Sequence, residues 1–502
     1  MPLIIKNPLV RTALPLALGA LSVLGFAPFY FYPIIIISLA SLIYIWRSCE
    51  TPTQAAFMGF MYGLGLFGTG IYWIYISLHS FGGMPAIMAG FSTFVLAAFL
   101  SLFPAAVGAL SKRISSNREH AFLIAVPIFW ALADWVRSWI FTGFPWLTIG
   151  YSQLPHSPLA GYVPLIGIYG TSFITVFIAS LTNALLTKSL ASSCRRGALG
   201  ALSLIIISGA LLKLLTWATA SGEPISVSLL QGNIDQTIKW APETAQRTLH
   251  QYLNMAEQST AKLIVLPETA MPVLSSNMPP EMIERLKQHA IGNKGDILVG
   301  MVERENGEYF NSVLSFGSAE TAVYRKSHLV PFGEFIPFKQ VFGWIYRDWL
   351  NMPLSDLSRG SIHQQPMQVA GEKVAVNICY EDVFGEEIIR QLPTATLLVN
   401  VSNDAWYGNS YAADQHMQFS QARALETGRM MLRATNTGAT AIIDAKGHIL
   451  AHAPHFVQTT LEGTVQGYTG STPYVRWGNW PFVLFSFVMI ALLWRRNTNV
   501  HK

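Results

Sequence analysis

The sequence predicts an α-helical membrane bundle of eight transmembrane helices joined to an α/β domain with buried sheets. Charged residues make up 12% of the 502 residues, about half the usual share, and the deficit is concentrated in the first 220 residues. From about residue 224, short β-branched runs such as KLIVLPE alternate with helical stretches, which is typical of layered α/β domains. We therefore expect seven transmembrane helices in 1–220, the α/β domain in 221–475, and the last transmembrane helix with a tail in 476–502.

Eight apolar segments have the length and polarity of membrane spans. They lie roughly at 11–28, 30–46, 55–77, 85–111, 121–139, 162–187, 198–218 and 478–494. Lys and Arg precede the first span and follow the second, fourth, sixth and eighth, whereas the loops near 79–85 and 140–160 carry neither. Because basic loops stay on the cytoplasmic side, this distribution predicts cytoplasmic termini and an α/β domain on the opposite side of the membrane.

The composition argues against several other classes of protein. The formal net charge is +5, but no stretch clusters Lys and Arg with interleaved aromatic residues, so nucleic acid is not an expected partner. The sequence contains no Gly-rich phosphate loop, no paired CxxC and no HExxH, and its 12 His residues are scattered. We therefore expect neither a metal nor a cofactor.

Cysteine usage singles out one thiol. Cys49 and Cys194 fall at the cytoplasmic ends of predicted spans, and Cys379 is the one cysteine in the α/β domain. A lone thiol on the oxidising side of a membrane has no partner for a disulfide. The sequence therefore predicts that Cys379 is used for its chemistry.

Three motifs in the α/β domain bring together residue types that suit acyl transfer. They are VLPET around Glu268, YRKSHLVPFGE around Lys326 and NICYED around Cys379, each at the end of an apolar β-like run. A Cys can attack a carbonyl and hold the acyl group as a thioester. A Glu can take the thiol proton and return it to a leaving group. A Lys can lower the thiol pKa and stabilise an oxyanion.

The order Glu, Lys, Cys with these flanking residues resembles the nitrilase superfamily. The whole chain resembles the bacterial apolipoprotein N-acyltransferases, because the spans, the domain order and the motifs VLPE, YxKxxLVPFGE, CYE and VSNDAWYG agree. The resemblance implies an α-β-β-α sandwich in which Glu268 is the base, Lys326 stabilises the oxyanion and the thiolate, and Cys379 is the nucleophile. It also implies a supporting Glu334 and substrate-binding roles for Trp240, Tyr380, Glu381 and Trp406.

The resemblance further implies the substrates and the location. The donor would be a membrane phospholipid, and the acceptor would be the α-amino group of the S-diacylglyceryl-cysteine at the N-terminus of an apolipoprotein. The chain would act as a monomer in the bacterial inner membrane, with its catalytic domain in the periplasm, and would catalyse the last step of lipoprotein maturation. The residues alone leave three alternatives open: a membrane-tethered amidase or nitrilase that uses water, a receptor or scaffold with an inactive fold, and a transporter.

Some residues also allow structural readings. Glu268 could be a solvated loop residue, Lys326 a strand-end lysine whose head reaches solvent, Cys379 an inert buried thiol and Tyr380 a packed aromatic residue. Asn403 and Tyr407 are expected to support structure.

Three further features of the sequence carry expectations of their own. Arg423, Glu426 and Arg429 have the spacing of a surface ion-pair ladder. Asp134 and Arg137, three residues apart in a predicted span, are expected to pair with each other. The segment 337–352 is either a membrane-dipping lid or a buried amphipathic helix.

Overall fold

The computed structural model describes residues 8–115, 118–187, 189–337 and 356–498. The chain divides into two compact units. The first, here called the helical unit, comprises Met1–Tyr75, Ile87–Leu215 and Arg476–Lys502. The second, here called the sheet unit, comprises Ile76–Ala86 and Thr216–Val475.

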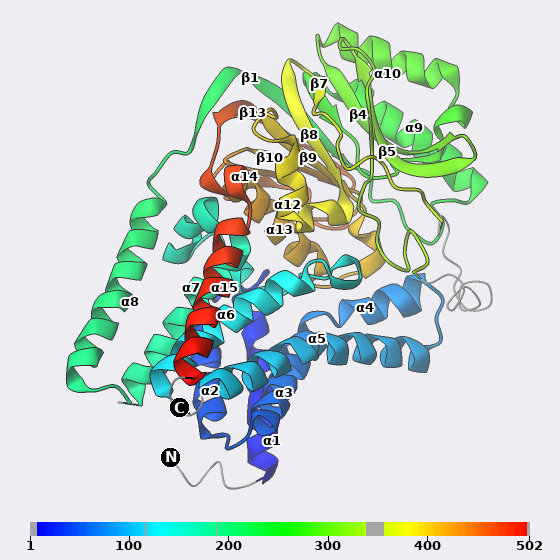
Figure 1. Ribbon diagram of the computed structural model, residues 1–502. Helices are drawn as coiled ribbons and strands as arrows, with labels where there is room; N and C mark the ends of the chain where they lie inside the picture. The colour runs from blue at the N-terminus through cyan, green and yellow to red at the C-terminus, as the bar shows by residue number, and fades with distance from the viewer. Residues whose placement is uncertain (1–7, 116–117, 188, 338–355, 499–502) are drawn as a thin grey trace. The chain divides into compact units, whose positions relative to one another are not determined.

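The helical unit consists of long apolar helices (Figure 1). They are α1 (Pro8–Ser22), α2 (Pro33–Ser48), α3 (Pro52–Gly70), α5 (Ala86–Ser115), α6 (Glu119–Arg137), α7 (Val163–Leu186), α8 (Ser192–Leu212) and α15 (Trp480–Thr498). Four stretches of the described chain are long and apolar enough to cross a membrane: Ala86–Ser115, Glu119–Arg137, Pro158–Leu186 and Ser192–Leu212. A fifth span is possible where Pro52–Gly70 and Trp73–Phe81 meet at a 49° bend.

This number is smaller than the eight spans expected from the sequence. The remaining apolar stretches, Thr12–Gly25, Pro33–Ser48 and Trp480–Arg495, form helices of 10–17 residues, whereas a straight helix across the hydrocarbon core needs about 20. The structure thus supports a membrane-spanning helical unit with four or five candidate spans.

A buried ion pair lies inside the helical unit, as the sequence predicted. Arg137 Nη2 lies 3.0 Å from Asp134 Oδ1, and both side chains are buried. Arg137 also donates hydrogen bonds to the carbonyl oxygens of Phe144 and Trp146, at 2.6 and 2.7 Å. Asp134 accepts another from the hydroxyl of Ser172 at 3.1 Å. These partners satisfy both charges, which a low-dielectric surrounding requires.

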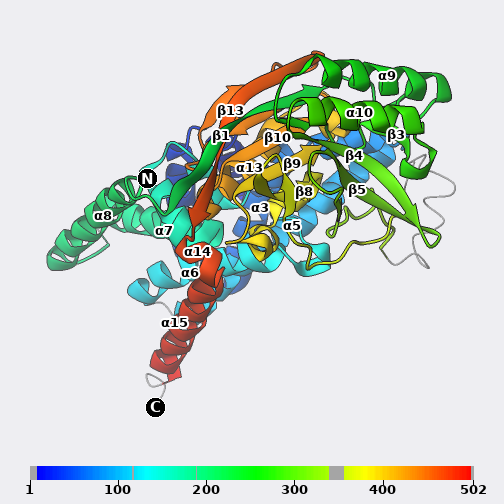
Figure 2. The same ribbon diagram turned by 90° about the horizontal axis from the view of Figure 1, so that it is seen from above.

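The sheet unit contains two sheets with mixed strand directions (Figure 2). The first follows the order β13-β1-β2-β4-β5-β6, with β3 beside β4, and the second follows β12-β11-β10-β9-β8-β7. The strands of the first sheet are β1 (Ala218–Gln231), β2 (Leu263–Val265), β3 (Met271–Leu274), β4 (Asp296–Glu305), β5 (Glu308–Gly317), β6 (Val323–Arg325) and β13 (Thr459–Gly470). Those of the second are β7 (Met367–Val369), β8 (Glu372–Ile378), β9 (Leu397–Ser402), β10 (Met431–Thr435), β11 (Ala441–Ile443) and β12 (Ile449–His452).

The sequence explains where these strands pair. β8, β9 and β10 are parallel neighbours and nearly every residue in them is buried, as expected for parallel strands covered on both faces. β4 and β5 form an antiparallel hairpin whose turn, Asn306-Gly307, has φ values of 51° and 86°. Asn-Gly favours this turn because both central residues must adopt positive φ.

The two sheets lie between two helical layers. Apolar residues of both sheets, including Val227 and Val399, form one core. The first sheet packs its other face against α9 (Pro242–Gln258) and α10 (Pro280–Gly292), through residues such as Leu253 and Leu286. The second packs against α13 (Ala412–Thr427), through Met417 and Ala424. The layers therefore run α-β-β-α.

One expectation for this unit is wrong, and one lies outside the described residues. Arg423, Glu426 and Arg429 do not form a surface ladder, because all three are at most 2% exposed. Arg423 and Glu426 do form an ion pair at 3.1 Å, but Arg429 donates instead to carbonyl oxygens such as that of Ala395. Of the segment 337–352, everything after Pro337 falls among the residues that the structure does not describe.

Candidate active site

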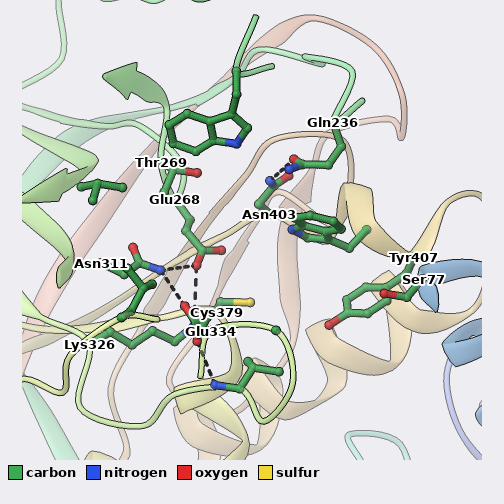
Figure 3. Close-up of a pocket in the computed structure, with 16 residues that line it drawn as sticks. Ser77, Gln236, Glu268, Thr269, Asn311, Lys326, Glu334, Cys379, Asn403 and Tyr407 are labelled. Carbon is green, nitrogen blue, oxygen red and sulfur yellow. Dashed lines mark hydrogen bonds and ion pairs between the residues drawn. The ribbon is translucent and has the colours of Figure 1, made fainter. Parts of the chain in front are cut away.

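A cavity of about 130 Å³ lies where the carboxyl ends of strands from both sheets meet (Figure 3). Glu268 follows β2, Lys326 follows β6 and Cys379 follows β8, and all three line this cavity. Glu334 also lines it, from the loop after β6. Glu268, the Lys326 motif that includes Glu334, and Cys379 are far apart in the chain, and the fold brings them together at one site.

Cys379 occupies a special backbone position. It is the first residue after β8 and has φ of 52°, a left-handed conformation that costs free energy for a residue with a Cβ. Its carbonyl oxygen accepts hydrogen bonds from Asn400 Nδ2 at 3.1 Å and from His416 Nε2 at 3.2 Å. These two donors hold the turn that presents the thiol at the strand end.

Lys326 lies between two carboxylates. Its Nζ lies 2.9 Å from Oε1 and 2.8 Å from Oε2 of Glu334, and 3.6 Å from Oε1 of Glu268. The side chain of Lys326 is 1% exposed. The ammonium group is therefore held in place by two negative charges in a nearly dry surrounding, where their attraction is stronger than in water.

Asn311, on β5, connects the two carboxylates. Its Nδ2 donates hydrogen bonds to Glu268 Oε1 at 2.7 Å and to Glu334 Oε1 at 3.0 Å. Glu334 Oε2 accepts a further hydrogen bond from the backbone N–H of Val330 at 2.8 Å. Sequence analysis missed Asn311, although a polar residue in the run FNSVLSF gave a weak signal.

Burial and neighbouring charges together set the protonation of the thiol and of the ammonium group. Burial raises the pKa of Cys379 well above its ordinary value, and the charge of Glu268 raises it further, while Lys326 acts in the opposite direction. For Lys326, burial lowers the pKa, but Glu334 and Glu268 outweigh burial and raise the pKa above its ordinary value. The resting site therefore holds a protonated lysine beside a neutral thiol.

The aromatic and polar walls complete the cavity. Trp240 and Trp406 line it together with Thr269, Asn403 and Tyr407, and the substrate-binding roles of the two tryptophans stay predictions. Trp406 belongs to the short helix η10 (Asp404–Tyr407) and makes an edge contact with Phe81, with ring centroids 6.4 Å apart. Phe81 ends the π-helix η3 (Ser77–Phe81), whose first residue, Ser77, also lines the cavity.

Tyr380 and Glu381 lie next to the nucleophile but do not line the cavity in the described structure. Glu381 accepts hydrogen bonds from the backbone N–H groups of Ser327 and Ile378, both at 2.7 Å, so it links the segment after Lys326 to the strand before Cys379. The ring of Tyr380 packs against Phe384 at 5.1 Å between centroids. Their substrate-binding roles stay predictions.

Lys239 is a second buried amine that sequence analysis missed. Its Nζ donates a hydrogen bond to Thr269 Oγ1 at 2.7 Å and lies 3.5 Å from the carbonyl oxygen of Glu268. Burial lowers its pKa to about 8, with Glu268 acting in the opposite direction. Lys239 thus fixes the turn that carries Glu268, and nothing in the sequence distinguishes it from a surface lysine.

A buried group of four charged residues lies next to the turn that carries Cys379. Arg433 contacts Asp382 at 3.0 Å and Asp404 at 2.9 Å. His416 contacts the same two carboxylates, at 2.9 Å for Asp382 and 2.8 Å for Asp404. Burial and Arg433 lower the pKa of His416, but the two carboxylates outweigh them and raise it to about 9. With His416 protonated, the two positive and two negative charges balance.

The arrangement has the parts for covalent acyl transfer. A thiol, a carboxylate and an ammonium group line one cavity, and the ammonium group carries the charge needed to stabilise a thiolate or an oxyanion. Together with the two-sheet fold, the site defines a protein of the carbon–nitrogen hydrolase class. Residues 226–474 match the family model described as Carbon-nitrogen hydrolase.

The comparisons then identify the particular family. Residues 18–181 match the model of the Apolipoprotein N-acyltransferase N-terminal domain. The chain is 49% identical to the apolipoprotein N-acyltransferase of Nitrosomonas europaea over 97% of both chains. It is 41% identical to that of Chromobacterium violaceum over 95% of this chain and 93% of the relative. The chain belongs to the apolipoprotein N-acyltransferase family, and this membership favours a transferase over the hydrolase, scaffold and transporter alternatives.

A solved carbon-nitrogen hydrolase from Helicobacter pylori G27 is also similar, with a TM-score of 0.37 and 17% identity, covering 52% of this chain and 94% of that chain.

Proposed function

We propose that the chain transfers an acyl chain from a membrane phospholipid, through a thioester on Cys379, to the α-amino group of the N-terminal S-diacylglyceryl-cysteine of apolipoproteins. This transfer is the last step of lipoprotein maturation. The observation that carries the proposal is the convergence of Glu268, Lys326 and Cys379 on one cavity, in a chain that belongs to this family.

The first half-reaction loads the enzyme. Glu268 takes the proton of the Cys379 thiol as the sulfur attacks the ester carbonyl of the phospholipid. Lys326 stabilises the negative charge that develops on sulfur and then on the carbonyl oxygen. The carbon–oxygen ester bond breaks, Glu268 returns the proton to the departing glycerol oxygen, and a lysophospholipid leaves.

The second half-reaction transfers the acyl chain from Cys379 to the acceptor. The neutral α-amine of the acceptor attacks the thioester carbonyl, and Glu268 accepts a proton from the amine nitrogen. The carbon–sulfur bond breaks, the sulfur leaves as a thiolate beside Lys326, and Glu268 returns the proton to it. The product is an amide, and the free thiol is regenerated.

The remaining site residues would support these steps. Glu334 orients Lys326 through its two contacts of 2.9 and 2.8 Å. Trp240 and Trp406 contact substrate in the cavity that they line. Glu381 acts through the two segments that it links, and Tyr380 contributes to substrate binding from beside Cys379.

The membrane arrangement belongs to the same proposal. Eight spans, both termini in the cytoplasm and a catalytic domain in the periplasm follow from the basic loops of the sequence. The protein acts in the inner membrane as a monomer.

Mass spectrometry of Cys379 tests the chemistry. Purified enzyme mixed with phospholipid vesicles should gain the mass of one acyl chain on the peptide that carries Cys379, and lysophospholipid should appear in equal amount. Adding a diacylated lipopeptide should remove this mass and yield an N-acylated peptide. Cys379→Ala should form neither adduct nor product. Release of free fatty acid without amide would favour the hydrolase, and amide formation by Cys379→Ala would exclude the thioester route.

A further inference from the structure

A chain of three side-chain amides runs from the backbone to the active-site cavity. Asn436 lies on the loop after β10, Asn403 follows β9, and Gln236 lies on the loop after β1. Gln236 and Asn403 both line the cavity, yet their side chains are 7% and 4% exposed overall. Figure 3 shows this pair on a different wall from the group formed by Glu268, Asn311 and Lys326.

The side-chain amide of Asn436 is oriented by backbone atoms, each of which can only donate or only accept a hydrogen bond. The backbone N–H of Ile234 donates to Asn436 Oδ1 at 2.9 Å, and the Ile234 carbonyl oxygen accepts from Asn436 Nδ2 at 2.8 Å. A backbone N–H is always a donor and a carbonyl oxygen always an acceptor. The oxygen and nitrogen of the Asn436 amide are therefore assigned by chemistry.

This assignment passes along the chain of amides. Asn436 Nδ2 donates its second hydrogen bond to Asn403 at 3.1 Å, so the contacted atom must be the oxygen, Oδ1. The other end of Asn403, Nδ2, donates to Gln236 at 2.6 Å, so Gln236 must offer its oxygen, Oε1, there. An amide side chain has one oxygen and one NH₂ group. The NH₂ group of Gln236 is thereby directed away from Asn403.

No other hydrogen bond holds this NH₂ group. Among the described residues, Gln236 Nε2 has no hydrogen-bond partner, although the side chain is almost fully buried. Nε2 is not among the fully buried unpaired atoms of the described residues, so this NH₂ group is accessible and can bind a ligand in the cavity that Gln236 lines. The ligand atom must be a hydrogen-bond acceptor. A neutral amide supplies no positive charge, so it suits an uncharged acceptor such as a carbonyl oxygen.

We infer that Gln236 binds the main-chain carbonyl oxygen of the acceptor's N-terminal cysteine, and so makes the site select a peptide α-amine over other amines. This inference rests on the proposed function. In a peptide, the α-amine and this carbonyl group are both bonded to one Cα atom. An amine that reaches the Cys379 thioester therefore carries its carbonyl oxygen into the cavity that both Cys379 and Gln236 line.

Two acceptors separate this role from others. One is an S-diacylglyceryl-cysteinyl peptide. The other is S-diacylglyceryl cysteamine, which has the same lipid and a primary amine but lacks the main-chain carbonyl group of cysteine. The variants are Gln236→Met, which has a similar shape and no amide, and Gln236→Glu, which keeps an acceptor for Asn403 but loses the donor. Gln288→Met, on the exposed face of α10, is the matched control.

The expected result is a change that depends on the acceptor. Both Gln236 variants should raise KM for the peptide acceptor about fivefold to tenfold, the effect of one lost hydrogen bond. For S-diacylglyceryl cysteamine, KM of each variant should stay within about twofold of the wild-type KM. The two acceptors differ in amine basicity, so the variant-to-wild-type ratios of KM are compared rather than the KM values themselves. Thioester formation from phospholipid serves as a check that each variant is folded.

Three outcomes would overturn the inference. An equal loss with both acceptors would give Gln236 a structural role, and slower thioester formation would assign it to the phospholipid donor. Unchanged kinetics in both variants would leave it no role in the reaction. If wild-type enzyme formed no amide with either acceptor, the proposed function itself would fail.

Discussion

Lys326 and Glu334 make a two-point contact inside the cavity, with Nζ of the lysine 2.9 Å from one carboxylate oxygen and 2.8 Å from the other. Three donors converge on this carboxylate: Lys326 Nζ, Asn311 Nδ2 and the backbone N–H of Val330. Glu334 therefore sets the position of the ammonium group that serves the thiol, and it does so from the last residue of the motif that carries the lysine.

Replacing Glu334 with Gln should slow thioester formation about tenfold to a hundredfold, the scale of a lost electrostatic contact in an active site. An amide has one acceptor oxygen for three donors, so its NH₂ group would face a donor and Lys326 would move towards Glu268. Single-turnover loading with phospholipid measures the rate. Glu334→Asp, which keeps the charge, should recover part of it. If Glu334→Gln formed the thioester at the wild-type rate, Glu334 would have no role in this step.

Replacing Asn311 with Asp should slow thioester formation about tenfold or more. The substitution exchanges a donor shared by Glu268 and Glu334 for a third negative charge. That charge repels both carboxylates and competes with the thiol for Lys326. Single-turnover loading of wild type and variant, measured side by side, tests this. Loading of the variant at the wild-type rate would contradict it.

The reactivity of the free thiol should respond in opposite directions to its two charged neighbours. Burial and Glu268 raise the pKa of Cys379, and Lys326 lowers it. Glu268→Gln should therefore speed alkylation of Cys379 by iodoacetamide at a given pH, and Lys326→Met should slow it. The rate in all three enzymes should rise with pH, because the thiolate is the nucleophile. Mass spectrometry separates Cys379 from the exposed Cys194, which serves as the internal control. Changes of equal sign in the two variants would contradict the expected electrostatics.

Protonated His416 should stabilise the fold at neutral pH. Its pKa is raised to about 9 in the folded protein, from about 6.5 in an unfolded chain. A raised pKa contributes stability that is fully present below pH ~6.5 and is lost as the pH rises through ~9, amounting to on the order of 3 kcal/mol.

Thermal unfolding in detergent between pH 6 and 10 measures this contribution. The transition temperature should fall with pH in wild type and vary less in His416→Gln. The double variant His416→Gln/Asp404→Asn should be more stable than His416→Gln alone, because it restores the charge balance with Arg433. A double variant that is less stable than both single variants would show that charge balance is not what matters.

Local sequence patterns predicted the site residues that lie within recognisable motifs. Glu268, Lys326 and Cys379 each end an apolar β-like run, and the fold places all three at one cavity. The α/β organisation was predicted for the same reason, since β-branched runs mark strands wherever they end up. The ion pair of Asp134 and Arg137 was predictable because both partners lie on one helix, three residues apart.

Contacts between distant segments were not predictable. Asn311 reaches Glu268 across 43 residues of chain, and Asn436 reaches Ile234 across 202. The spacing of Arg423, Glu426 and Arg429 suits a solvent-facing ladder, but α13 ends at Thr427, before Arg429, and all three side chains are buried. The eight spans stay a prediction: four or five stretches of the described chain are long and apolar enough to cross a membrane, and three further apolar stretches form helices of 10–17 residues.

The contact of Phe81 with Trp406 has a consequence for any attempt to separate the chemistry from the membrane. Ser77 and Phe81 belong to the sheet unit, although they lie between two apolar helices in the sequence and 135 or more residues before the rest of that unit begins at Thr216. A fragment cut at Thr216 and Val475 would keep Glu268, Lys326 and Cys379 but would leave the ring of Trp406 bare and remove Ser77 from the cavity wall. The complete catalytic unit is therefore discontinuous in the sequence, and a fragment that keeps its cavity wall must include Ile76–Ala86 as well as Thr216–Val475.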